Sequence, residues 1–190
     1  MGSIVDERGY NQGYEPAAST VIRTQRRASF FLDEMQLSVQ NSILEIGCGT
    51  GEIAYRIAQK VKATVLGTDL SRGFIDRANQ NFKLSNLSYI VLDFNKPAEL
   101  DGKKFDYIVG NGILHHLYYN LDSAFASFKQ LLNPNGKIIF MEPNIYNPYC
   151  ALIFNIPIFR KMAHLEPDEM AFAKYFIQKK LRQSGFSDIK

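Results

Sequence analysis

The sequence predicts an α/β fold in which a mostly parallel, doubly wound sheet carries helices on both faces. Three observations predict it: short β-rich runs alternate with helical patterns over residues 42–141, a glycine-rich turn follows the first run, and acidic residues end the next two. Strands separated by single helices run parallel through right-handed crossovers. With 190 residues, of which 46% are hydrophobic, the chain can bury one sizeable core, so we expect a single domain over residues 1–190.

Residues 1–41 are expected to form an N-terminal cap segment and one helix. Residues 1–18 are polar and rich in Gly and Tyr. Apolar residues then recur at helical spacing from Val21 to Met35, and Ser19 or Thr20 can serve as the N-cap.

Residues 42–141 are expected to form the sheet and its helices. The expected segments are strand 42–46, helix 52–60, strand 63–68, helix 72–84, strand 88–92, strand 105–109, helix 121–132 and strand 137–141. The sequence Asn-Pro-Asn-Gly at residues 133–136 predicts a turn immediately before the last strand.

The last part of the chain has a different pattern. Residues 142–167 contain four prolines among Tyr, Phe and Ile residues. A long irregular connection is usually a functional lid or a disordered segment, and its apolar content argues against disorder, so we interpret it as a lid with a helical piece. In residues 168–190 we expect a final helix over 168–184, and residues 185–190 resemble the start of another strand.

The strongest chemical signal is the sequence Leu-Glu-Ile-Gly-Cys-Gly-Thr-Gly at residues 44–51, where a strand turns into a helix. Gly47, Gly49 and Gly51 permit a sharp turn with positive φ and the close approach of a ligand. The helix that follows points unpaired N–H groups toward the ligand, which favours an anionic group such as a carboxylate.

Acidic residues at two further strand ends strengthen this signal. Asp69 stands twenty residues after Gly49, where its carboxylate can accept hydrogen bonds from both hydroxyls of a ribose. Asp93 and Phe94 end the third strand and could bind an adenine, the carboxylate by its amino group and the ring by its face. All three elements fall at the carboxyl ends of strands, where open α/β sheets bind their ligands.

These elements, together with residues 111–117, resemble the class I S-adenosylmethionine-dependent methyltransferases, a Rossmann-like family. The resemblance is greatest to the small-molecule branch with an LHH motif after the fourth strand, here Leu114-His115-His116, and it extends from about Ile43 to Ile189. It implies S-adenosyl-L-methionine as cofactor, S-adenosyl-L-homocysteine as product, and transfer of a methyl group by in-line displacement to a small-molecule or lipid-like acceptor.

The resemblance also implies roles for individual residues. It assigns Glu45, Gly47, Cys48, Gly49 and Gly51 to the segment that holds the methionine part of the cofactor, Asp69 to the ribose, Leu70, Asp93 and Phe94 to the adenine, and the backbone carbonyl of Asn111 to the methionine amino group. Tyr14 lies in a segment that in this family often folds over the cofactor. We expect the side chain of Cys48 itself to be a small buried filler.

The catalytic candidates are His115, His116 and Glu142. Alignment of donor and acceptor can supply most of the acceleration of this reaction, so a dedicated base is not required. Either histidine could take a proton from an acceptor hydroxyl, or could merely pack or hydrogen-bond near the cofactor. Glu142 could orient or deprotonate an acceptor, or cap the following turn.

Three other functions share part of this sequence pattern. A nicotinamide-dependent dehydrogenase also uses a glycine-rich turn and a later acid, but the spacing of residues 45–51 and the Asp93 element favour methyl transfer. A non-catalytic cofactor-binding module and methylation of a macromolecule remain open. The net charge of +3 is scattered along the chain, and residues 111–114 differ from an Asn-Pro-Pro-Tyr-like tetrad, so a nucleic-acid partner is not favoured.

The remaining expectations concern metal, location and assembly. Cys48 and Cys150 are far apart, which predicts reduced thiols in a cytoplasmic protein and no metal site. No apolar run approaches the length of a membrane span. Relatives typically continue through two more strands, so we expect strands 6 and 7 to be truncated and the strand at 137–141 to have an open edge, through which two copies could pair as a homodimer.

Overall fold

The structure, a computed structural model, describes residues 18–94, 100–163, 165, 167 and 169–190. Within this part of the chain, one parallel sheet has the strand order β3-β2-β1-β4-β5. The chain therefore winds outward from β1 in both directions, which confirms the predicted doubly wound sheet. The strands are β1 (Ser42–Ile46), β2 (Thr64–Asp69), β3 (Leu87–Val91), β4 (Phe105–Asn111) and β5 (Leu132–Met141).

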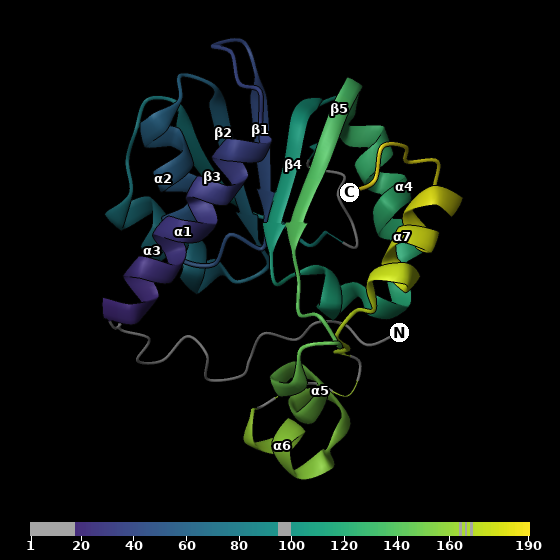
Figure 1. The fold of residues 1–190 in the computed structure, drawn as a ribbon. Helices are drawn as coiled ribbons and strands as arrows, with labels where there is room; N and C mark the ends of the chain where they lie inside the picture. The colour runs from purple at the N-terminus through teal and green to yellow at the C-terminus, as the bar shows by residue number, and fades with distance from the viewer. Residues whose placement is uncertain (1–17, 95–99, 164, 166, 168) are drawn as a thin grey trace.

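Helices cover both faces of the sheet (Figure 1). One face carries the first three helices, and α4 and α7 lie on the other, while α5 and α6 lie beyond the arrowheads of β4 and β5. Among the described residues, no helix combines the length and the apolar character needed to cross a bilayer. The helices are α1 (Ala18–Glu34), α2 (Glu52–Lys60), α3 (Arg72–Asn81), the 3-10 helix η3 (Leu114–Asn120), α4 (Leu121–Leu131), α5 (Pro148–Asn155), α6 (Pro157–Met162) and α7 (Lys174–Gln183).

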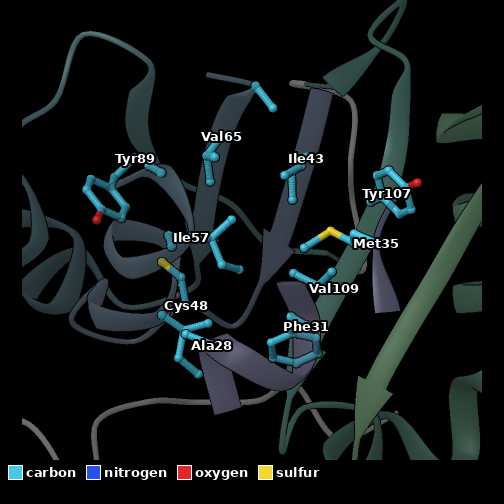
Figure 2. Close-up of a cluster of buried hydrophobic side chains, with 14 of the residues drawn as sticks. Ala28, Phe31, Met35, Ile43, Cys48, Ile57, Val65, Tyr89, Tyr107 and Val109 are labelled. Carbon is cyan, nitrogen blue, oxygen red and sulfur yellow. The ribbon is translucent and has the colours of Figure 1, made fainter. Parts of the chain in front are cut away.

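The central strand β1 is buried on both faces, because its successive side chains point to opposite sides of the sheet and helices cover both sides. Ile43 of β1 belongs to the cluster that includes Phe31 of α1, whereas the neighbouring Leu44 belongs to the cluster that includes Phe125 of α4. Figure 2 shows part of the first cluster, in which Cys48 lies among apolar side chains. The sequence prediction that Cys48 is a small buried filler is therefore confirmed.

The predicted helix at 168–184 is wrong at its beginning, because α7 starts at Lys174. The backbone before it is extended and forms a parallel bridge between Asn144 and Phe172. The Phe172 N–H donates to the Pro143 carbonyl at 2.9 Å, and the Ile145 N–H donates to the Phe172 carbonyl at 2.9 Å. These hydrogen bonds hold the two ends of the 145–171 segment together.

Two other predictions at the edge of the sheet are corrected. The predicted turn at 133–136 lies inside β5, because Leu132 already pairs with Phe105, and the register shifts between Phe105 and Tyr107. The expected strand start at 185–190 is wrong, since residues 186–190 form no strand and Phe186 instead packs edge-on against Phe125. β5 forms one edge of the described sheet, and pairing of two copies through it stays a prediction.

Candidate active site

A cavity of about 410 Å³ opens at the carboxyl ends of the strands, at the point where the chain reverses direction between β1 and β4. Its volume is in the range of small-ligand sites, which is about 300–1,000 Å³. Eight of the residues predicted from the sequence line it: Gly47, Gly49, Asp69, Leu70, Asp93, Phe94, His115 and His116.

Other predicted residues do not line this cavity. Among the described residues, these are Glu45, Cys48, Gly51, Asn111 and Glu142. Tyr14 lies outside the described residues. The sequence reasoning did not single out several residues that do line it, among them Thr68, Phe74, Ile113, Leu165 and Glu169.

The glycine loop adopts the backbone conformation that its sequence predicts. Gly49 has φ of +54° and Gly51 has φ of +88°, a region that side-chain-bearing residues rarely adopt. A Cβ on Gly51 would lie 2.8 Å from the Tyr89 ring and from the Ala78 Cβ, whereas a Cβ on Gly49 would meet nothing within 4 Å. Gly51 is therefore required by packing inside the protein, and Gly49 leaves open space beside the cavity.

Asp69 joins two of the loops around the cavity. Its Oδ2 accepts the backbone N–H of Gly49 at 2.8 Å, and its Oδ1 accepts that of Ser71 at 2.9 Å. The carboxylate is thus held at the cavity wall by backbone donors from the turns after β1 and β2. A carboxylate at this position can also take part in binding a ligand with hydroxyl groups.

A buried carboxylate lies behind the glycine loop. Glu45 is 1% exposed, and its Oε2 has no hydrogen-bond partner in the part of the chain that the structure describes. Burial raises the pKa of Glu45 well above its usual range, a hydrogen bond from the Ala54 backbone partly offsets this, and the charges of Glu52 and Asp69 raise the pKa further. Three carboxylates therefore surround the loop, and together they favour a ligand that carries positive charge.

Glu142 caps the start of η3 from another part of the chain. Its Oε1 accepts the backbone N–H groups of Ile113 at 2.9 Å and Leu114 at 2.8 Å. Its Oε2 accepts the backbone N–H of His115 at 3.3 Å and lies 2.9 Å from the His115 Nδ1. In the tautomer whose Nδ1 N–H donates to the carboxylate, the other ring nitrogen, Nε2, has a lone pair available for a ligand.

A second histidine and carboxylate meet at the same wall. The His116 Nδ1 lies 3.1 Å from the Oε1 of Glu169, whose residue is 5% exposed. The two histidine rings are neighbours, with centroids 4.2 Å apart and planes inclined by 36°. The cavity thus has an acidic, glycine-rich end and an end with two imidazoles and one carboxylate.

Residues 43–136 match the methyltransferase-domain family, and they contain the glycine loop, Asp69, Asp93 and both histidines. These residues make up just under half of the chain, and over them it is similar to the S-adenosylmethionine-dependent methyltransferases. The cofactor of this family is S-adenosylmethionine.

Proteins and structures similar to this methyltransferase differ widely in size. A highly reducing polyketide synthase, PKS6 of Gibberella zeae, is 27% identical over 164 residues, which cover 80% of this chain and 6% of the synthase. An uncharacterized methyltransferase of Mycobacterium tuberculosis is 29% identical over 119 residues, which cover 61% of this chain and 59% of that protein. The chain therefore spans less than two thirds of the length of these relatives.

Solved structures show the same fold in this methyltransferase family. The magnesium protoporphyrin IX methyltransferase of Synechocystis PCC 6803, with bound S-adenosylhomocysteine, aligns with a TM-score of 0.65 at 18% identity. The alignment covers 89% of this chain and 74% of that one. At this identity the likeness concerns the fold alone.

Proposed function

We propose that this chain binds S-adenosylmethionine in the cavity and transfers its methyl group to a small-molecule or lipid-like acceptor by in-line displacement. The single observation that carries the proposal is the loop at Gly49, which leaves open space beside Asp69 and in front of the buried Glu45. A glycine whose added Cβ would meet no described atom within 4 Å, next to three carboxylates, fits a ligand with a cationic amino-acid end.

The residues at the acidic end would hold the cofactor. The Oε2 of Glu45, which has no hydrogen-bond partner among the described residues, and the Asn111 carbonyl suit the ammonium group, and the Asp69 carboxylate suits the ribose hydroxyls. Asp93 and Phe94 line the cavity beside them and suit the adenine edge and face. Cys48 and Gly51 shape the loop from behind.

The bound cofactor supplies a methyl group on a sulfonium, which is already activated toward displacement. What the chain must add is alignment of the acceptor with that methyl group, which can provide most of the rate increase. Apolar Ile113, Leu117 and Leu165 and polar His115 and His116 line the other end of the cavity, so this end suits an acceptor with an apolar body and a polar group. We assign Glu142 as a positioning residue, because its two oxygens already contact three backbone N–H groups and the His115 ring.

The 142–167 segment supports a lipid-like acceptor. Its helices α5 and α6 lie beyond the strand ends (Figure 1), and large apolar side chains there are exposed, including Tyr149, Ile158 and Met162. Leu165 connects this segment to the cavity lining. We therefore propose that the segment is the acceptor lid.

The test has a binding step and a transfer step. Calorimetry should show one site for S-adenosylhomocysteine, with affinity reduced in Asp69→Asn. Affinity should be unchanged in Asp122→Asn, a matched change at an exposed side chain of α4 outside the cavity lining. Extracts of small metabolites and of lipids, each incubated with the chain and S-adenosylmethionine, should then release S-adenosylhomocysteine and yield a methylated product. Absence of binding heat would overturn the proposal, and binding without transfer from any extract would favour a non-catalytic cofactor-binding module.

A further inference from the structure

Three side chains at the acceptor end of the cavity have the chemistry of metal ligands. His115, His116 and Glu169 each offer one ligand atom, and these atoms all lie within 4.8 Å of one another. We propose that they bind one divalent transition-metal cation of the Zn²⁺ type, which holds an oxygen of the methyl acceptor. The metal part of this inference stands on the geometry alone, and its link to the acceptor rests on the proposed function.

The distances suit a shared cation. Zn²⁺ binds imidazole nitrogen and carboxylate oxygen at about 2.0–2.2 Å, so two ligands of one ion lie about 3–4.4 Å apart. The His116 Nδ1 and the Glu169 Oε1, at 3.1 Å, are already in this range. No two of the three ligand atoms are more than 4.8 Å apart, so the widest separation exceeds this range by at most about 0.4 Å.

The contact between His116 and Glu169 is not a hydrogen bond. Although the two atoms are 3.1 Å apart, the buried His116 Nδ1 has no hydrogen-bond partner among the described residues. A buried polar atom left unpaired costs about 1–3 kcal/mol. A cation that accepts lone pairs from both atoms would remove this cost, because neither atom then needs to donate to the other.

His115 is supported from behind as metal-binding histidines usually are. Its Nδ1 lies 2.9 Å from the Glu142 carboxylate, which fixes the ring and leaves the Nε2 lone pair for a ligand. Carboxylates that accept the second ring N–H of a metal-bound histidine orient it and make it a stronger ligand. The same role explains why Glu142 lies outside the cavity lining.

The ligand set also specifies the chemistry of the acceptor. Two imidazoles and one carboxylate suit Zn²⁺ and similar ions, and three protein ligands leave a coordination position for a substrate oxygen. A hydroxyl or enol bound there loses its proton more readily, because the cation stabilises the oxygen anion. We therefore infer an acceptor with a hydroxyl or enol group.

The transfer step balances without a protein base. The acceptor O–H bond breaks and its proton passes to solvent. An oxygen lone pair forms the new C–O bond as the S–CH₃ bond breaks, and that electron pair stays on sulfur. The products are the methyl ether, S-adenosylhomocysteine and one proton.

The sequence prediction of no metal site relied on the spacing of the two cysteines. That spacing gives no information about a site formed by His115, His116 and Glu169. Among the described residues, these three side chains form a cluster of metal-ligand type. Glu169 is 53 positions from His116 along the chain, so no local motif contains the full set.

Direct metal binding tests the inference. The whole chain, treated with chelator and dialysed, is titrated with Zn²⁺ by calorimetry and with Co²⁺ by visible absorption, which reports ligand number and geometry. We expect one ion per chain, with affinity at least about 100-fold lower in Glu169→Gln and about 10–100-fold lower in Glu142→Gln, which removes only the support of His115. Glu34→Gln, a matched change at the Glu34–Lys190 ion pair far from the cavity, should bind as the wild type does.

The outcomes separate this inference from the proposed function. Thermal melts of each variant establish that it is folded, and calorimetry of the metal-free chain with S-adenosylhomocysteine is measured separately. If the cofactor product binds but neither metal does, or if Glu169→Gln and His116→Ala bind metal as tightly as the wild type, the metal site is wrong and the proposed function stands. If the metal binds in a variant-sensitive way but the cofactor product does not, the metal site stands and the proposed function fails.

Discussion

The two ends of the cavity are built in different ways. At the acidic end, Asp69 contacts Gly49, only twenty residues earlier in the chain, and every element is a turn that directly follows a strand. At the histidine end, Glu142 contacts His115, which lies 27 residues earlier in the chain. Glu169 follows α5 and α6 in the chain and contacts His116. The comparison teaches that a short motif can encode a cofactor site, whereas an acceptor site depends on how distant segments pack.

The largest expected effect separates two glycines of the same loop. Gly51→Ala should lower the free energy of unfolding by about 3–5 kcal/mol, because the added Cβ adds overpacking against Tyr89 and Ala78 to the cost of a left-handed backbone. Gly49→Ala should lower the free energy of unfolding by only about 1–2 kcal/mol, since its Cβ would meet no described atom within 4 Å. The same change should still weaken cofactor binding. Urea unfolding and calorimetry measure the two effects, and equal destabilisation by both changes would contradict the difference we describe.

The next effect concerns the acidic end alone. Asp69→Ala should weaken binding of S-adenosylhomocysteine by about 100-fold, because two backbone N–H groups of the turns lose their acceptor and the ribose loses its own. Asp69→Asn keeps one acceptor oxygen, so its affinity for S-adenosylhomocysteine should fall by only about tenfold. Calorimetry gives both values, and an unchanged affinity in Asp69→Ala would refute the assigned role.

A smaller effect should be confined to the histidine end. Glu142→Gln should lower the free energy of unfolding by about 1–3 kcal/mol, because the amide cannot accept all the N–H groups that start η3. Affinity for S-adenosylhomocysteine should stay within about threefold of the wild type. A large loss of cofactor affinity in this variant would show that the two ends are not independent.

The smallest effect serves as a control at the opposite end of the sheet. Asp106 accepts hydrogen bonds from the Ser42 N–H and the Asn133 side chain. Partial burial raises the pKa of Asp106, but these hydrogen bonds outweigh burial and the net pKa is lowered. The ionised Asp106 therefore stabilises the folded state at pH values above its pKa in the unfolded chain, which is about 3.9. This stabilisation is lost as the pH falls through the lower pKa that Asp106 has in the folded state.

Thermal melts of the wild type and Asp106→Asn test this contribution. The difference in melting temperature should be small at pH 6 and should narrow below about pH 4. Neither cofactor nor metal affinity should change, since Asp106 is outside the cavity lining. If the difference in melting temperature between the wild type and Asp106→Asn grew as the pH was lowered, it would contradict a lowered pKa of Asp106.

The sequence predicted the sheet and the acidic end well because both depend on local signals. Alternation of strand and helix patterns predicted the parallel strands β1 to β5, and the spacing of the glycines and Asp69 predicted that they belong to one site. The start of α7 could not be predicted, because hydrogen bonds between Phe172 and residues 143–145 hold that backbone extended. Glu169 was missed for a similar reason: only tertiary packing places this acid beside His116.

The bridge between Asn144 and Phe172 also bears on how new acceptor preferences arise. Residues 145–171 leave the sheet and return to it at one point, and the Arg160 side chain inside the segment donates to the carbonyls of Phe154, Pro167 and Glu169. The segment thus carries its own internal connections, and the described part of it meets the sheet at this bridge and the two histidines through Phe154 and Glu169. An insertion of this kind can be exchanged between homologous enzymes at the two bridge residues, so substrate range can diverge while the nucleoside-binding half stays as it is.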